Sequence, residues 1–139
     1  VARADHIDNA IQGALQQGQW VICDRFIDST RVYQGATGGV PRGLINALEQ
    51  LTVGALTPDV TFILDIPAEE GLARVKARAE ARGLDRFESQ ELMTHERIRR
   101  GFLDIGEEEP GRCVVVDASQ PEAMVAEDVW ETVLQRLNP

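Results

Sequence analysis

The residue types best suited to chemistry are an acid and an arginine, Asp24 and Arg25, directly after the short apolar run from Trp20 to Cys23. Such a run after a glycine predicts a buried parallel strand, and ligands bind at the carboxyl ends of strands in an open α/β sheet. A carboxylate there suits a divalent ion, and a guanidinium matches phosphate oxygens bidentately. Taken alone, an Asp-Arg pair is more often a simple ion pair.

The residues that follow the pair favour a binding site. Ser29, Thr30, Tyr33 and Gln34 recur at helical spacing and give a polar face beside Arg25. Two of them have a structural alternative: Ser29 suits a helix cap, and a lone tyrosine such as Tyr33 is often a half-buried core residue with a solvated hydroxyl.

A second basic cluster lies farther along the chain. Arg74, Arg78 and Arg82 are spaced i, i+4 and i+8, so they share one face of a helix. A solvated basic face is the usual explanation. Here Gly83 and the segment Asp85-Arg86-Phe87-Glu88 favour a mobile lid over about residues 74–88 that closes over phosphates.

Three separated motifs, in this order and spacing, resemble those of bacterial thymidylate kinases. They are Arg3 on an upstream helix, the segment from Asp24 to Gly35, and the arginine-rich segment from Arg74 to Glu88. The resemblance extends over essentially the whole chain. It implies transfer of the ATP γ-phosphoryl group to thymidine monophosphate (dTMP), with magnesium as the metal ion and a homodimer as the oligomeric state.

The resemblance also implies roles at the acceptor site. Arg25 binds the acceptor phosphate, and Asp24 orients it or holds Mg²⁺ through water. Tyr33 lies against the sugar, where its ring would crowd a ribose 2′-hydroxyl and select deoxyribose. Arg3 matches an arginine that contacts a thymine carbonyl. Two further residues could bond the base or sugar: Thr30 and Gln34.

In similar kinases the lid arginines contact the ATP phosphates, here Arg74, Arg78, Arg82 and Arg86. The arginine just before the lid glycine is expected to reach the transferring phosphoryl group, which favours Arg82. The longer stretch before the glycine leaves the choice between Arg78 and Arg82 open.

One expected motif is absent from the sequence. A phosphate-binding loop needs G-x-x-x-x-G-K-[ST], and none surrounds Lys76, the one lysine. We therefore expect an incomplete enzyme that is inactive alone and lacks the N-terminal strands, including the P-loop strand. The alternatives are a deoxynucleoside kinase and a non-catalytic nucleotide-binding or dimerisation module.

The elements that must position these residues alternate between helices and strands. Strands are expected at Val60–Ile66 and Cys113–Asp117, in addition to Trp20–Cys23. Helices are expected at Arg3–Gln17, at about Arg42–Val53 with Leu44, Leu48 and Leu51 inward, and at Pro67–Ala81, Ser89–Glu108 and Pro121–Leu137. This order predicts one α/β domain over residues 1–139, a three-layer, P-loop-kinase-like parallel sheet with helices on both faces. In it Val114–Val116 pairs in parallel with Phe62–Leu64.

Bulk properties exclude several classes of function. A net charge of −9 argues against a nucleic-acid polymer as partner, and no apolar stretch reaches membrane-spanning length. Cys23 and Cys113 both lie in apolar runs, which predicts buried, reduced thiols and a cytoplasmic protein. His6 and His95 have no ligand-like spacing, so no zinc site is expected.

Overall fold

The computed structural model describes residues 11–52, 56–80 and 89–137. The chain divides into two compact units between Thr57 and Pro58. The first unit is helical in its described part, and the second holds the sheet. Within the described ranges, every helix falls short of the length or the apolarity that a membrane span requires.

The sheet of the second unit consists of two parallel strands, β1 (Thr61–Asp65) and β2 (Cys113–Asp117). Phe62 lies opposite Val114 and Leu64 opposite Val116, so the expected parallel pairing is confirmed. Both strands are rich in β-branched and aromatic residues, which suit the pleated surface.

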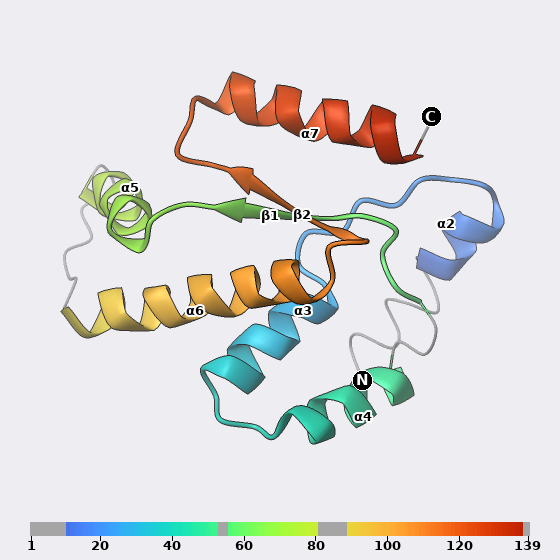
Figure 1. Cartoon of the computed structure of the whole chain (residues 1–139), viewed down its shortest axis with the longest axis horizontal. Coiled ribbons are helices and arrows are strands. Elements are labelled where there is room, and N and C mark those ends of the chain that lie inside the picture. The colour runs from blue at the N-terminus through green and yellow to red at the C-terminus, as the bar shows by residue number, and fades with distance from the viewer. Residues whose placement is uncertain (1–10, 53–55, 81–88, 138–139) are drawn as a thin grey trace. The chain divides into compact units, whose positions relative to one another are not determined.

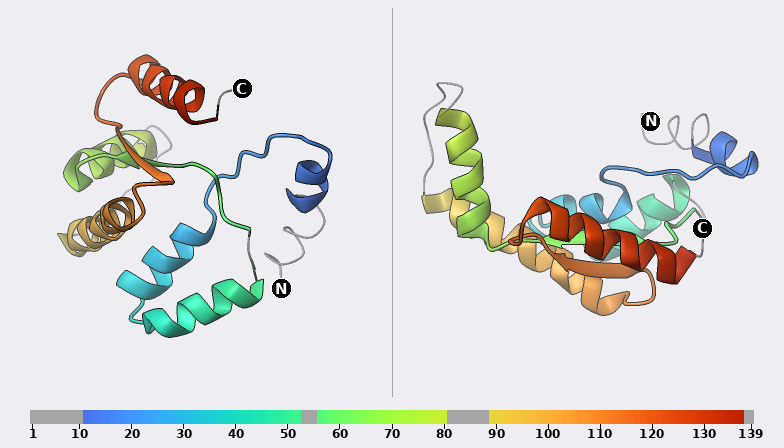
Figure 2. Two further views of the ribbon diagram at one scale, coloured as in Figure 1. Left: turned by 45° about the vertical axis from the view of Figure 1, so that its right-hand side comes forward. Right: turned by 90° about the horizontal axis from the view of Figure 1, so that it is seen from above.

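Helices cover both faces of this sheet. Helix α6 (Ser89–Glu108) lies on one face and α7 (Glu122–Leu137) on the other, while α5 (Ala68–Glu80) stands at the carboxyl end of the strands (Figures 1 and 2). The second unit therefore has the expected three layers. The expected helices here are confirmed, α6 with the same bounds and α5 and α7 within one residue.

The close approach of α6 to the sheet depends on a glycine. A Cβ atom at Gly106 would lie 3.0 Å from Cγ2 of Val115 and 3.4 Å from Cδ1 of Ile63. Ile63 and Ile105 are buried beside this contact. Because interiors are close-packed, a side chain at this position would push α6 away from the strands.

The first unit contains α2 (Gln12–Gln16), α3 (Ile27–Thr30), the π-helical segment η2 (Arg31–Ala36) and α4 (Arg42–Thr52). Ile11 and Ile27 are buried against each other, with Phe26 and Leu56 packed beside them. The chain leaves α2 through Gly18, whose φ of 71° a glycine adopts without strain, so the expected end of this helix is confirmed.

The expected strand at Trp20–Cys23 is wrong. The segment forms no strand, all four of its side chains are exposed, and Ile22 is 97% exposed. An apolar run becomes a strand only when a neighbour supplies hydrogen bonds, and none of the described residues pairs with this run. Cys23 is consequently exposed rather than buried, whereas Cys113 is buried as expected; both thiols are free.

The expected inward stripe of α4 is also wrong. Leu44, Leu48 and Leu51 are exposed, Leu51 by 84%, and Ile45 is the buried residue. A Cβ atom at Gly35 of η2 would lie 2.9 Å from Cδ1 of Ile45, so η2 and α4 meet at this point. The face of α4 that carries Ile45 is therefore the packed one in this unit.

Candidate functional site

The bend at Asp24 and Arg25 places both side chains at the surface. Both residues are exposed, and the chain enters α3 two residues later. Arg25 has a φ of 64° and is the one non-glycine residue with positive φ in the described part of the chain. A strained backbone conformation of this kind persists only when the surrounding structure holds it in place, and such residues are frequent at functional sites.

The guanidinium of Arg25 lies over the ring of Tyr33, 5.5 Å from the ring centroid. This distance is within the range of a cation–π contact. Two residues that the sequence placed in one site are thus brought together, across the short helix α3.

Tyr33 lies in η2, where the backbone is wound more loosely than in an α-helix. The amide of Thr37 donates to the carbonyl of Val32 over 3.1 Å, the i to i+5 bond of a π-helix. The Thr37 hydroxyl also donates to the carbonyl of Tyr33 over 2.8 Å, and Val32 is 1% exposed. Tyr33 is therefore carried on a firmly held turn, and π-helical turns are frequent at functional sites.

The other expected residues of this face lie on the same helical stretch. Thr30 ends α3 and is half-buried, and Gln34 lies in η2 and is exposed. Ser29, expected to be a cap, lies inside α3 instead, and Phe26 occupies the N-cap position without a side-chain hydrogen bond.

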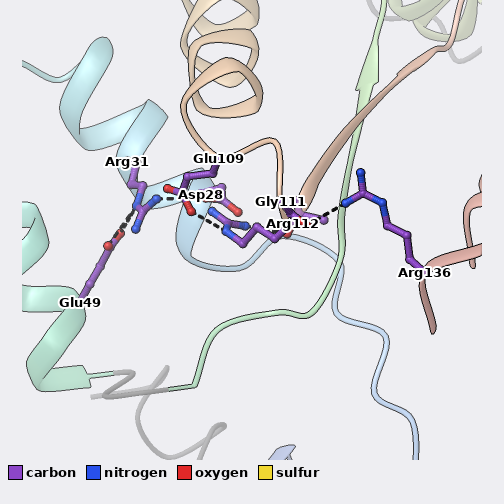
Figure 3. A network of polar contacts seen from close by, with 8 residues as sticks. Asp28, Arg31, Glu49, Glu109, Gly111, Arg112 and Arg136 are labelled. Atoms are coloured by element: carbon purple, nitrogen blue, oxygen red, sulfur yellow. Dashed lines mark hydrogen bonds and ion pairs between the residues drawn. The ribbon is translucent and has the colours of Figure 1, made fainter.

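Sequence reasoning missed an ionic cluster that joins residues of α3, η2 and α4. Arg31 Nε lies 3.2 and 3.1 Å from the two carboxylate oxygens of Glu49, and Arg31 Nη1 lies 3.7 Å from Oδ1 of Asp28 (Figure 3). Asp28 is buried, and Arg31 is half-buried. The cluster fastens η2 to α4. The i, i+3 spacing of Asp28 and Arg31 is visible in the sequence, whereas Glu49 is 18 residues away and gives no local signal.

The donor chemistry of Asp24 fits a magnesium ion. Its carboxylate is exposed and has no hydrogen-bond or ion-pair partner among the described residues. Magnesium keeps several waters and needs only one or two protein carboxylates beside substrate phosphates. Within the described ranges, no group of three or more His, Cys, Asp or Glu side chains is placed to hold a metal.

In the second unit, Arg74 contacts the loop after β2. Its guanidinium donates to the carbonyls of Ala118 and Ser119 over 3.0 and 3.2 Å, and to the Glu70 carboxylate over 2.6 Å. Arg78 is exposed one turn later, and its Nε donates to the Arg74 carbonyl over 3.4 Å. The guanidinium of Arg74 is therefore bound by groups of the protein itself, and its expected contact with ATP phosphates stays a prediction.

Two carboxylates stand at the end of the strands. Asp65 accepts two hydrogen bonds from Arg99, of 2.8 and 3.0 Å, which fixes α6 to the end of β1. Asp117 accepts from both the hydroxyl and the amide of Ser119, and these bonds lower the pKa of Asp117, although partial desolvation opposes them. Neither residue was singled out from the sequence.

Three of the expected site residues lie outside the described residues: Arg3, Arg82 and Arg86. The choice between Arg78 and Arg82 as the lid arginine therefore stays open.

Comparison with known proteins gives one consistent result. The family model described as thymidylate kinase matches residues 1–129. A relative named thymidylate kinase from Bradyrhizobium diazoefficiens is 49% identical over 138 residues, which are 99% of this chain and 60% of the relative. A second, from Rhodopseudomonas palustris, is 47% identical over 136 residues, 98% of this chain and 59% of the relative.

A solved structure agrees with these matches. The crystal structure of thymidylate kinase from Ehrlichia chaffeensis superposes with a TM-score of 0.68 at 32% identity, over 94% of this chain and 58% of that one. The chain has the expected P-loop-kinase-like α/β fold. It spans about three fifths of the length of the relatives that it matches.

Proposed function

Because this chain belongs to the thymidylate kinase family, we propose that it takes part in transferring the γ-phosphoryl group of ATP to dTMP, which gives dTDP and ADP. An oxygen of the dTMP phosphate attacks the γ-phosphorus, and the bond from that phosphorus to the β,γ-bridging oxygen breaks. Such a reaction depends on positioning and charge neutralisation.

The observation that carries the proposal is the exposed guanidinium of Arg25 held beside Tyr33 on a strained bend. In a family member, this guanidinium is suited to bind the acceptor phosphate through two parallel hydrogen bonds. The ring of Tyr33 would then lie against the deoxyribose, and Thr30 and Gln34 would face the sugar or base. Arg3 would contact the thymine.

Magnesium, when bound, neutralises charge on the phosphate oxygens, and the exposed carboxylate of Asp24 is the group that would hold it, directly or through water. The lid arginines Arg74, Arg78, Arg82 and Arg86 would contact the ATP phosphates, with Arg82 favoured for the transferring group. The family resemblance further supports a cytoplasmic homodimer.

Calorimetric titration of the full chain with dTMP tests the acceptor site. Charged hydrogen bonds are worth about 1.5–3 kcal/mol, so Arg25→Ala should weaken dTMP binding by about 10- to 100-fold. The matched control is Arg97→Ala, which removes an exposed arginine of α6 and should leave binding unchanged. Equal affinity of Arg25→Ala and the unmodified chain would remove Arg25 from the site.

A second candidate is a module that binds the nucleotide without transferring phosphate. The observation behind it is that the 139 residues, which span about three fifths of the length of the matched relatives, contain no G-x-x-x-x-G-K-[ST] motif. Incubation with dTMP, ATP and magnesium tests the two functions: formation of ADP and dTDP supports the kinase and contradicts the module, whereas dTMP binding without product agrees with the module and also with a kinase that is inactive as this chain alone. Tighter binding of thymidine than of dTMP would favour a deoxynucleoside kinase.

A further inference from the structure

We propose that the ring of Tyr33 positions the guanidinium of Arg25 for the acceptor phosphate, so that recognition of the phosphate depends on an aromatic side chain at position 33. This inference rests on the proposed function. It gives Tyr33 a second role, beside its expected contact with the sugar.

The side chains of Tyr33 and Arg25 are held in place to different degrees. Tyr33 is half-buried in η2, its carbonyl accepts a hydrogen bond from Thr37, and its neighbour Val32 is almost completely buried. The cluster of Arg31 with Glu49 fastens the same turn to α4. Arg25, by contrast, is exposed on a bend. The ring of Tyr33 is therefore held in place, and it limits the positions that the long side chain of Arg25 can take.

The geometry leaves the donors of Arg25 available. A guanidinium uses its flat face for stacking on an aromatic ring, whereas its N–H groups point outward in its plane. Among the described residues, no side chain forms a hydrogen bond or ion pair with the guanidinium of Arg25, which contacts the ring of Tyr33. A phosphate can therefore be bound in the plane of the guanidinium while the contact with the ring of Tyr33 is kept.

The backbone at Arg25 supports the same conclusion. A φ of 64° is unfavourable for an arginine, and a glycine would adopt it freely. The strained conformation belongs to the residue whose side chain reaches the ring eight positions later, so the bend and the contact form one arrangement.

The test compares dTMP with thymidine, which lacks the phosphate. A sugar contact of Tyr33 affects both ligands alike and cancels in the ratio of their dissociation constants. A cation–π contact of about 0.5–2 kcal/mol corresponds to about 2- to 30-fold. Tyr33→Leu should therefore reduce the preference for dTMP over thymidine by that factor, while Tyr33→Phe, which keeps the ring, should preserve it. In an Arg25→Ala background, Tyr33→Leu should have no further effect on the ratio.

A spectroscopic measurement on the unmodified, ligand-free chain keeps the inference testable if Tyr33→Leu fails to fold. The ring should shift the side-chain proton resonances of Arg25 upfield of those of the exposed Arg97, and Tyr33→Phe should keep the shift. An unchanged preference in folded Tyr33→Leu, or Arg25 resonances that coincide with those of Arg97, would overturn the inference alone. Failure of the unmodified chain to bind dTMP would overturn the proposed function and this inference with it.

Discussion

The ionic cluster of Arg31 gives a prediction whose size follows from burial. Arg31→Met removes the cation that both Asp28 and Glu49 face, and it keeps most of the aliphatic stem. The side chains of Asp28 and Glu49 are 8% and 12% exposed, and that of Arg31 is 27% exposed. The two carboxylates would therefore remain close together in a poorly hydrated place.

The expected loss in the free energy of unfolding lies between two limits. Exposed ion pairs contribute about 0–1 kcal/mol, and removing one partner of a fully buried pair costs about 3–5 kcal/mol. The cluster is nearer the buried limit, so Arg31→Met should lower the free energy of unfolding by about 2–3 kcal/mol. The matched control is Arg100→Met, which breaks an exposed pair with Asp104 and should cost less than about 0.5 kcal/mol.

Urea unfolding followed by circular dichroism gives the free energies, and hydrogen exchange of residues 27–49 shows whether the loss is local to η2 and α4. Glu49→Gln should recover part of the loss in the Arg31→Met background, because it removes the negative charge that Glu49 would keep without Arg31. A cost for Arg31→Met no larger than that for Arg100→Met would refute the inference that burial makes this cluster strong.

Three further predictions concern glycines and charges. Gly106→Leu should destabilise the chain by about 2 kcal/mol, because α6 contacts the sheet at this glycine. Gly43→Ala should instead stabilise α4 by about 0.5 kcal/mol, because nothing lies within 4 Å of the added Cβ atom. Thermal unfolding compares the two variants, and equal effects would contradict the close packing at Gly106. Arg25→Gly should be more stable than Arg25→Ala by about 1 kcal/mol, since glycine accepts the positive φ; the reverse order in urea unfolding would show that the bend is unstrained. Hydrogen bonds from Ser119 lower the pKa of Asp117, so they stabilise the fold at a pH above the ordinary carboxyl pKa, and this stabilisation is lost as the pH falls below about 4. In an NMR titration, Ser119→Ala should raise the pKa of Asp117. An unchanged pKa would show that Ser119 is not the cause of the shift.

Much of the second unit could be predicted because its signals are local. Local residue pattern, together with proline and glycine, predicts the bounds of α6 and the two β-branched strands Thr61–Asp65 and Cys113–Asp117. The parallel pairing of the two strands follows from the helices that connect them. The run Trp20–Cys23 has the same local signal and is still not a strand, because pairing depends on a neighbour that the pattern does not contain.

At the candidate site, residue types were easier to predict than their geometry. The residue types at positions 25 and 33 are read from the sequence, but the left-handed bend, the π-helical turn and the cation–π contact of the two side chains depend on the folded structure. Likewise, Arg74 follows a helical pattern of arginines, yet its partners include carbonyls 44 and 45 residues away. Long-range partners of this kind leave no periodic signal.

The most direct test of an acceptor site at the Arg25 bend is an NMR titration of the full chain with dTMP. Shifts should concentrate at residues 24–37, with Arg25 and Tyr33 among the largest, and they should become much smaller when thymidine replaces dTMP or when Arg25 is changed to alanine. Saturable dTMP binding that leaves Arg25 and Tyr33 unshifted, or no binding at all, would contradict the account.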